Sequence, residues 1–116
     1  MEIQIIPTTK PLMATVGDDL QFYCEAAGRG STESSYLKWY KQTSPPKKVE
    51  LDKSLVQRQG YLSGGTRVDK EVVLIRNVKK ENSGTYICER YHTSSGTYDS
   101  RSTQVLITGK DFSPLF

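Results

Sequence analysis

The 116-residue sequence has little of what identifies many enzyme, metal-binding and membrane proteins. It contains two cysteines and one histidine, which excludes the four-cysteine and two-cysteine, two-histidine ligand sets of zinc and iron–sulfur sites. Its longest apolar run is the four residues Val72–Ile75, whereas a membrane-spanning helix needs about 20 apolar residues and a signal peptide about 7–15. We therefore expect no direct membrane insertion by this stretch of chain.

Motifs for cofactors and catalysis are also scarce. The glycine pairs Gly28-Arg-Gly30 and Gly64-Gly65 lack the strand-to-helix setting in which a glycine-rich loop cradles phosphate. The histidine lies in a Ser- and Gly-rich stretch, residues 92–102, that holds Asp99 but no sign of an oriented base or an oxyanion hole. The acidic pair Asp18-Asp19 has the composition of a turn. These patterns predict no catalytic residue, no metal and no cofactor.

Charge is weak and dispersed. Sixteen basic and thirteen acidic residues give a formal net charge of +3, which is too small and too evenly spread to indicate nucleic acid as a partner. The dibasic pairs Lys47-Lys48 and Lys79-Lys80, with Arg58, Arg67 and Arg76, are candidates for weak glycosaminoglycan contact. Solvated turn residues explain the same pattern equally well.

What the sequence does contain is alternation of apolar and polar residues in short segments, separated by Gly, Pro, Ser and Asp. Such period-two patterns predict β-strands. We expect about nine of them, over residues 2–6, 11–16, 20–26, 36–42, 47–53, 55–62, 67–78, 85–91 and 103–108. Pro7 lacks a backbone donor, so it is expected to divert the first strand from its first pairing partner. The pattern indicates a single all-β domain, an antiparallel β-sandwich.

Both cysteines lie inside apolar alternating segments, so their side chains are expected to face the core. They either form one disulfide or remain two buried thiols. A bridge between Cys24 and Cys88 would close a loop of 64 positions, which stabilises a fold by roughly 4 kcal/mol in the chain-entropy model. A bridge of this kind suits an oxidising, extracellular compartment.

One constellation is highly specific. Trp39 follows Cys24 by fifteen positions and begins the run Trp39-Tyr-Lys-Gln42, and the second cysteine ends the motif Asn82-Ser-Gly84-Thr-Tyr86-Ile-Cys88. Over residues 2–108 the chain resembles the immunoglobulin superfamily. The resemblance implies a Greek-key sandwich with an inter-sheet disulfide, a tryptophan packed against it, and a tyrosine whose hydroxyl bonds backbone upstream.

The resemblance also bears on the subtype. The 49 positions between Trp39 and Cys88 leave room for two additional edge strands, C′ and C″, as in variable-type domains. The last strand lacks the Phe-Gly-x-Gly signature of rearranging receptors. Asn82 stands where the family is usually acidic, so neither Arg58 nor Arg67 is expected to pair there. The sequence is similar to a variable-type or long intermediate-type domain, with residues 109–116 as a linker or tail.

By this resemblance, the function would be non-catalytic protein recognition at the cell surface, in adhesion or as a receptor, as an excised piece of a larger protein. Partners would be a second copy of the chain or a related domain. Two alternatives stay open. One is a structural spacer in a matrix or multi-domain protein, with incidental heparin-like binding. The other is an intracellular muscle-type domain with reduced cysteines.

The candidate interface follows from alternation. If Trp39 and Tyr86 face the core, their neighbours face outward on one sheet: Lys38, Tyr40, Ile87, Glu89 and Tyr91. Leu106 joins them because Val105 and Ile107 have the core pattern. This set is more apolar than a solvated sheet face requires, and variable-type relatives associate through the corresponding GFCC′ face.

Two expectations accompany this interface. Lys38 and Glu89 are positioned either to pair across neighbouring strands or to meet opposite charges on a partner. The Tyr-, Ser- and Gly-rich stretch 90–101, which includes Tyr98, has the composition of a recognition loop and would form the rim. A charge at Ile87 or Tyr91 should weaken binding and leave thermal unfolding almost unchanged.

Overall fold

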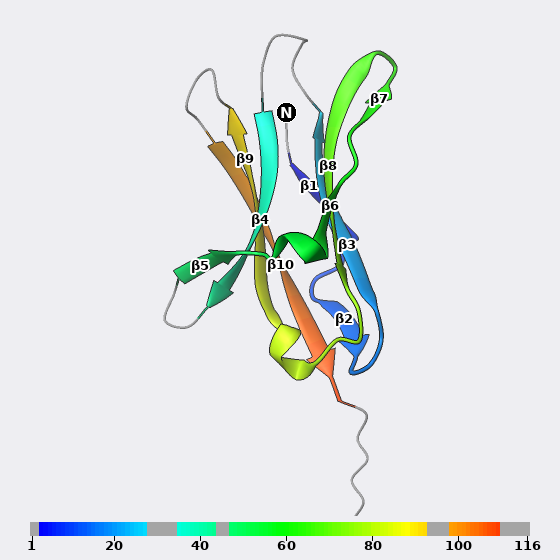
Figure 1. The fold of residues 1–116 in the computed structure, drawn as a ribbon, viewed down its shortest axis with the longest axis vertical. Helices are drawn as coiled ribbons and strands as arrows, with labels where there is room; N and C mark the ends of the chain where they lie inside the picture. The colour runs from blue at the N-terminus through cyan, green and yellow to red at the C-terminus, as the bar shows by residue number, and fades with distance from the viewer. Residues whose placement is uncertain (1–2, 28–34, 44–46, 93–97, 110–116) are drawn as a thin grey trace, which may run out of the picture.

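The computed structural model describes residues 3–27, 35–43, 47–92 and 98–109, and these form two sheets packed face to face (Figure 1). The strands are β1 (Gln4–Ile6), β2 (Leu12–Thr15), β3 (Leu20–Ala27), β4 (Ser35–Thr43), β5 (Lys47–Glu50), β6 (Val56–Arg58), β7 (Tyr61–Ser63), β8 (Thr66–Ile75), β9 (Gly84–His92) and β10 (Tyr98–Thr108). Two short 3-10 helices, η1 (Lys53–Leu55) and η2 (Lys80–Asn82), complete the described elements. The expected tail lies almost wholly outside the described residues, as do the centres of the two loops expected around residues 28–35 and 92–102.

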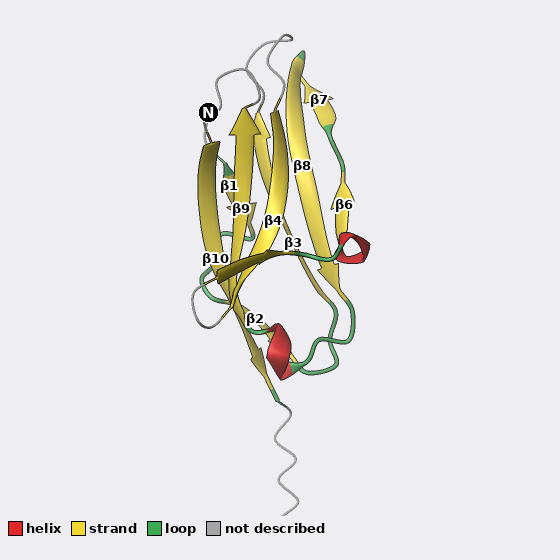
Figure 2. Ribbon diagram, turned by 60° about the vertical axis from the view of Figure 1, so that its left-hand side comes forward, coloured by secondary structure: helices red, strands yellow, loops and turns green. Residues whose placement is uncertain are grey.

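The predicted β-sandwich is confirmed. Sheet I has the strand order β1-β3-β8-β6, with β7 also pairing β8, and sheet II has the order β2-β10-β9-β4-β5. Figure 2 shows the two layers from the side, with β8 in one and β4 and β9 in the other. Ten strands are described rather than about nine, because the irregular segment expected over residues 55–62 divides into β6 and β7, which pair with different parts of β8.

The first strand changes sheets where proline was expected to divert it. β1 pairs antiparallel with β3 in sheet I, whereas β2 pairs parallel with β10 in sheet II. The switch occurs between Ile6 and Leu12, and both Pro7 and Pro11 lie in this connection. A residue without a backbone N–H cannot continue the first ladder, so the chain leaves it.

The room that the spacing leaves for a C″ edge strand is not filled by a described strand beside β5. After Glu50 the chain turns through η1, where the Asp52 carboxylate accepts the backbone N–H of Ser54 at 2.9 Å. It then enters β6, which pairs with β8 in the opposite sheet. Among the described strands, β5 is therefore the edge strand of sheet II next to β4, and β2 is the opposite edge. The length between Trp39 and Cys88 is taken up by this crossover and by the long β8.

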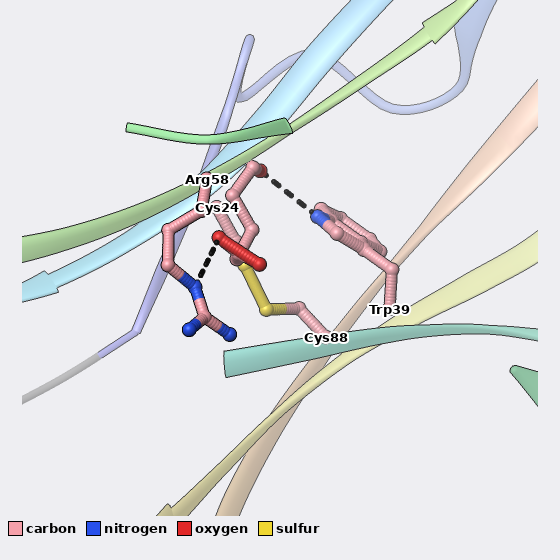
Figure 3. Close-up of a disulfide and its surroundings, with 5 residues drawn as sticks. Cys24, Trp39, Arg58 and Cys88 are labelled. Atoms are coloured by element: carbon pink, nitrogen blue, oxygen red, sulfur yellow. Dashed lines mark hydrogen bonds and ion pairs between the residues drawn. A yellow bond between two sulfur atoms is a disulfide. The ribbon is translucent and has the colours of Figure 1, made fainter. Parts of the chain in front are cut away.

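The core joins the two sheets through the predicted disulfide between Cys24 on β3 and Cys88 on β9. Figure 3 shows Trp39 beside this bridge. Its indole N–H donates to the backbone oxygen of Glu71 on β8 at 3.0 Å, which ties sheet II to sheet I a second time. The ring of Phe22 meets that of Trp39 edge-on, with centroids 5.2 Å apart. The predicted bridge and its tryptophan are thus confirmed.

The tyrosine corner is also present. The Tyr86 hydroxyl donates to the backbone oxygen of Asn82 at 2.6 Å, and burial raises the pKa of Tyr86 to about 12. The Asn82 side-chain oxygen accepts the backbone N–H of Lys79 at 2.8 Å. As expected, the nearby arginines pair elsewhere: Arg58 with Glu71 at 3.2 Å and Arg67 with Asp69 at 3.0 Å.

Candidate partner-binding face

The outward side chains of β5, β4, β9 and β10 form what we call the sheet II face. Strand alternation decides its composition, because Trp39 and Cys88 point into the core and their neighbours must point away. The register places Lys38 opposite Glu89 and Tyr40 opposite Ile87. The outward set read from the sequence on β4 and β9 thus lies together on one face.

Glu89 is the unusual member of this face, because its carboxylate is buried although it points outward. The residue is only 4% exposed. The Tyr91 hydroxyl donates to Glu89 Oε1 at 2.8 Å, and the Lys48 ammonium pairs with Oε2. That ammonium also lies 4.9 Å from the centre of the Tyr40 ring. A buried carboxylate needs such partners, since an unpaired charge there would be costly.

The ion pairing differs from the Lys38–Glu89 cross-strand pair, which was one of the two possibilities left open by the sequence. Lys38 lies opposite Glu89 in the register, yet its ammonium is 3.9 Å from Glu50 on β5. Glu89 takes Lys48 instead, whose long side chain reaches over Tyr40 from the β4–β5 hairpin. All four charges on this part of the face are therefore paired within the domain.

The same contacts set the electrostatics of Tyr91. Its hydrogen bond to the Glu89 carboxylate, and then one with Tyr40, raise the pKa of the Tyr91 hydroxyl far above its usual range. Losing the phenolic proton would place two anions side by side, so the hydroxyl stays protonated as a donor. The tyrosine and the carboxylate thus hold each other in fixed positions.

A third tyrosine on this face was missed in the sequence reading. Tyr36 lies opposite Tyr91 in the register and stacks on it, with ring centroids 5.4 Å apart and planes 24° apart. Tyr36 is two positions before Lys38 on the same strand, so the alternation that places Lys38 on the outer face also predicts Tyr36 there. We call Tyr36, Tyr40, Tyr91, Lys48 and Glu89 the tyrosine network.

Leu106 lies on the same sheet but apart from this network. The parallel ladder between β2 and β10 pairs it with Met13, and the two side chains are 43% and 63% exposed. The row formed by Thr85 and Gln104 separates them from Ile87. Met13 had no sequence signal, because only the parallel pairing of β2 brings it there.

Tyr98 is placed by its backbone alone. It begins β10 opposite Tyr91, and its side chain lies outside the described part of the chain, as do residues 93–97 of the expected rim loop.

The outward face, the disulfide, the adjacent tryptophan and the tyrosine corner together describe a known kind of domain. A profile of the immunoglobulin domain family matches residues 2–90 of the sequence. The chain belongs to this family. Immunoglobulin domains are typically non-enzymatic and commonly bind other proteins.

The described part of this immunoglobulin domain has no metal-ligand cluster, no free thiol and no membrane-spanning helix. Within residues 3–27, 35–43, 47–92 and 98–109, no three His, Cys, Asp or Glu side chains converge as metal ligands. Both cysteines are taken up by the disulfide. No helix among the described elements is long and apolar enough to cross a membrane.

Proposed function

We propose that this immunoglobulin domain is a non-catalytic recognition module of an extracellular adhesion or receptor protein. Its sheet II face would bind a protein partner, either a second copy of the chain or a related immunoglobulin domain. The Cys24–Cys88 disulfide supports an oxidising, extracellular setting.

The observation that carries the proposal is the make-up of the sheet II face. This face holds Ile87 and the three tyrosines of the tyrosine network. Its charged residues are already paired inside the domain, Lys38 with Glu50 and Lys48 with Glu89. The centres of protein interfaces are rich in tyrosine and poor in unpaired charge. Paired charges lose less on contact with an apolar partner, because their main interactions survive the removal of water.

Contacts of the basic residues favour protein recognition over a glycosaminoglycan-binding spacer. Each of the three arginines that suggested a basic surface has an acidic partner: Arg58 with Glu71, Arg67 with Asp69, and Arg76 with Asp19. Partial neutralisation of this kind weakens attraction to sulfated polymers. We therefore expect the protein to bind a heparin column weakly and to elute at low salt. Retention above physiological salt would support the spacer alternative.

Sedimentation over a range of concentrations tests the second-copy form of the proposal. Ile87→Asp places a charge on the sheet II face, and Leu74→Asp is its matched control, because Leu74 is a half-buried apolar residue on the outer side of sheet I. We expect concentration-dependent association that Ile87→Asp weakens at least about tenfold, the equivalent of about 1.4 kcal/mol. Equal effects of the two variants would contradict the proposal.

The structure changes one of the variants suggested by the sequence. Tyr91 holds the buried Glu89 carboxylate and stacks on Tyr36, so a charge at Tyr91 is now expected to lower stability as well as binding. Ile87 has no such polar contact, so a substitution there reports on binding with less interference. If the wild-type chain stays monomeric, the same pair of variants applies to binding of related immunoglobulin domains.

A further inference from the structure

A cavity of about 480 Å³ opens on the side of the sandwich, between the outer strands β5 and β6. Two buried core residues, Leu37 and Trp39, line it, together with Leu51 and Val56 from the crossover between the sheets. The cavity exists because η1 carries the chain across to sheet I and no described strand covers the edge of β5. Its volume falls within the range of roughly 300–1,000 Å³ that is usual for small-molecule sites.

Charged groups at the cavity have an excess of positive charge. Two carboxylates line it, and each has a cation: Glu71 accepts from Nε of Arg58 at 3.2 Å, and Glu50 pairs with Lys38 at 3.9 Å. Glu71 is 6% exposed, whereas the Arg58 side chain is 69% exposed. Figure 3 shows the Arg58 guanidinium held at Nε, with its two terminal nitrogens directed away from the carboxylate.

Two cationic donors thus remain for a ligand. Nothing in the described part of the chain binds the terminal nitrogens of Arg58 or the ammonium of Lys53, which also lines the cavity. A guanidinium offers parallel N–H donors that match the two oxygens of a carboxylate. Glu71 holds Arg58 beside the cavity, and this restraint reduces the conformational freedom that the side chain would lose on binding.

We propose that this cavity binds a small amphipathic carboxylate. The apolar part of the ligand would lie against the half-buried Leu51 and Val56, next to Trp39, which is only 2% exposed, and its carboxylate would bind Arg58 and Lys53. An amine is disfavoured, because both carboxylates at the cavity already have cationic partners. The site is separate from the sheet II face, so it does not depend on the proposed protein partner.

The single tryptophan of the chain gives a direct test. Its indole N–H produces one isolated signal in a proton–nitrogen correlation spectrum, and Trp39 lines the cavity. We expect titration with 4-phenylbutyrate to move this signal along a saturable one-site curve, with a Kd on the order of 1 mM. The amine 4-phenylbutylamine, which has the same apolar part, should bind at least about tenfold more weakly.

Three variants locate the carboxylate. Lys53→Gln changes an exposed side chain and should weaken binding of 4-phenylbutyrate about threefold. The double variant Arg58→Gln, Glu71→Gln removes the guanidinium without leaving a buried carboxylate unpaired, and should weaken binding at least about tenfold. Arg76→Gln, which removes a similarly exposed arginine away from the cavity, should leave the Kd unchanged.

Three titration results would overturn a carboxylate site in this cavity. No saturable movement of the Trp39 signal up to about 20 mM 4-phenylbutyrate would overturn it. Equal affinity for the amine and the carboxylate would overturn the assigned ligand chemistry. If the double variant does not fold, Lys53→Gln still tests the site, because this substitution changes only an exposed side chain. Unchanged affinity of Lys53→Gln for 4-phenylbutyrate would show that the ligand carboxylate does not bind at this end of the cavity.

Discussion

Replacing Glu89 by glutamine tests whether a buried carboxylate holds the tyrosine network together. The substitution keeps the shape of the side chain and removes its charge. A hydrogen bond to a charged group contributes about 1.5–3 kcal/mol, which applies to the bond from Tyr91 at 2.8 Å. The pair with Lys48, whose side chain is 44% exposed, contributes about 0.2–1 kcal/mol.

One effect opposes these losses. A neutral amide is easier to bury than a carboxylate, so part of the lost interaction is offset. We therefore expect Glu89→Gln to lower the free energy of unfolding by about 1–2 kcal/mol at pH 7. The pKa of Tyr91 should fall toward the usual tyrosine value of about 10, because the Glu89 carboxylate is the first cause of its rise.

Double-mutant cycles separate the two partners of Glu89. Urea unfolding of Glu89→Gln, Tyr91→Phe and the combined variant should give a coupling energy of about 1–2 kcal/mol. The corresponding cycle with Lys48→Gln should give less than about 1 kcal/mol. Absorbance at the phenolate band, followed against pH, reports the Tyr91 hydroxyl independently.

A larger coupling for Lys48 than for Tyr91 would refute this reasoning. It would mean that the exposed ion pair, and not the buried hydrogen bond, holds the carboxylate. An unchanged alkaline titration in Glu89→Gln would refute it in a second way, because the raised pKa of Tyr91 would then have another origin.

Two further predictions concern the core. Replacing Cys24 and Cys88 together by alanine should lower the free energy of unfolding by about 4 kcal/mol, because the bridge closes a loop of 64 positions; urea unfolding checks this, and a loss below about 1 kcal/mol would contradict it. Burial raises the pKa of Tyr86 to about 12 in the folded state, against about 10 when unfolded. The corresponding stability is fully present below pH 10 and is lost as the pH rises from about 10 to about 12. Tyr86→Phe should make the urea midpoint fall less steeply over this range than in the wild type, and identical slopes would show that Tyr86 does not contribute.

Much of the fold was predictable because strands show themselves in local alternation. The segment Leu20–Ala27 alternates between core and surface along its whole length, as expected from its sequence. Cysteine, tryptophan and tyrosine at family spacing identified the inter-sheet bridge and its neighbours. The spacing between Trp39 and Cys88 left room for a C″ strand, but the number of residues between two elements does not say which sheet the intervening chain joins. The cap at Asp52 and the pairing of β6 with β8 decide that it crosses to sheet I.

The sheet II face, too, was only partly predictable from the sequence. Alternation determined that Tyr40, Ile87 and Tyr91 point outward, since successive side chains of a strand must lie on opposite sides. Alternation does not say which outward residues touch. The partner of Glu89 depends on how far the Lys48 side chain reaches across a neighbouring strand.

The sequence by itself therefore determined the strands, the faces of those strands and the residues that join the two sheets. These properties depend on neighbours along the chain and on a spacing shared with a family. Only the tertiary structure decided the buried position of Glu89, the pairing of Met13 with Leu106 and the cavity beside Trp39. Each of these depends on strand register or on a crossover between sheets, which are relations between segments distant in the chain and leave no local pattern.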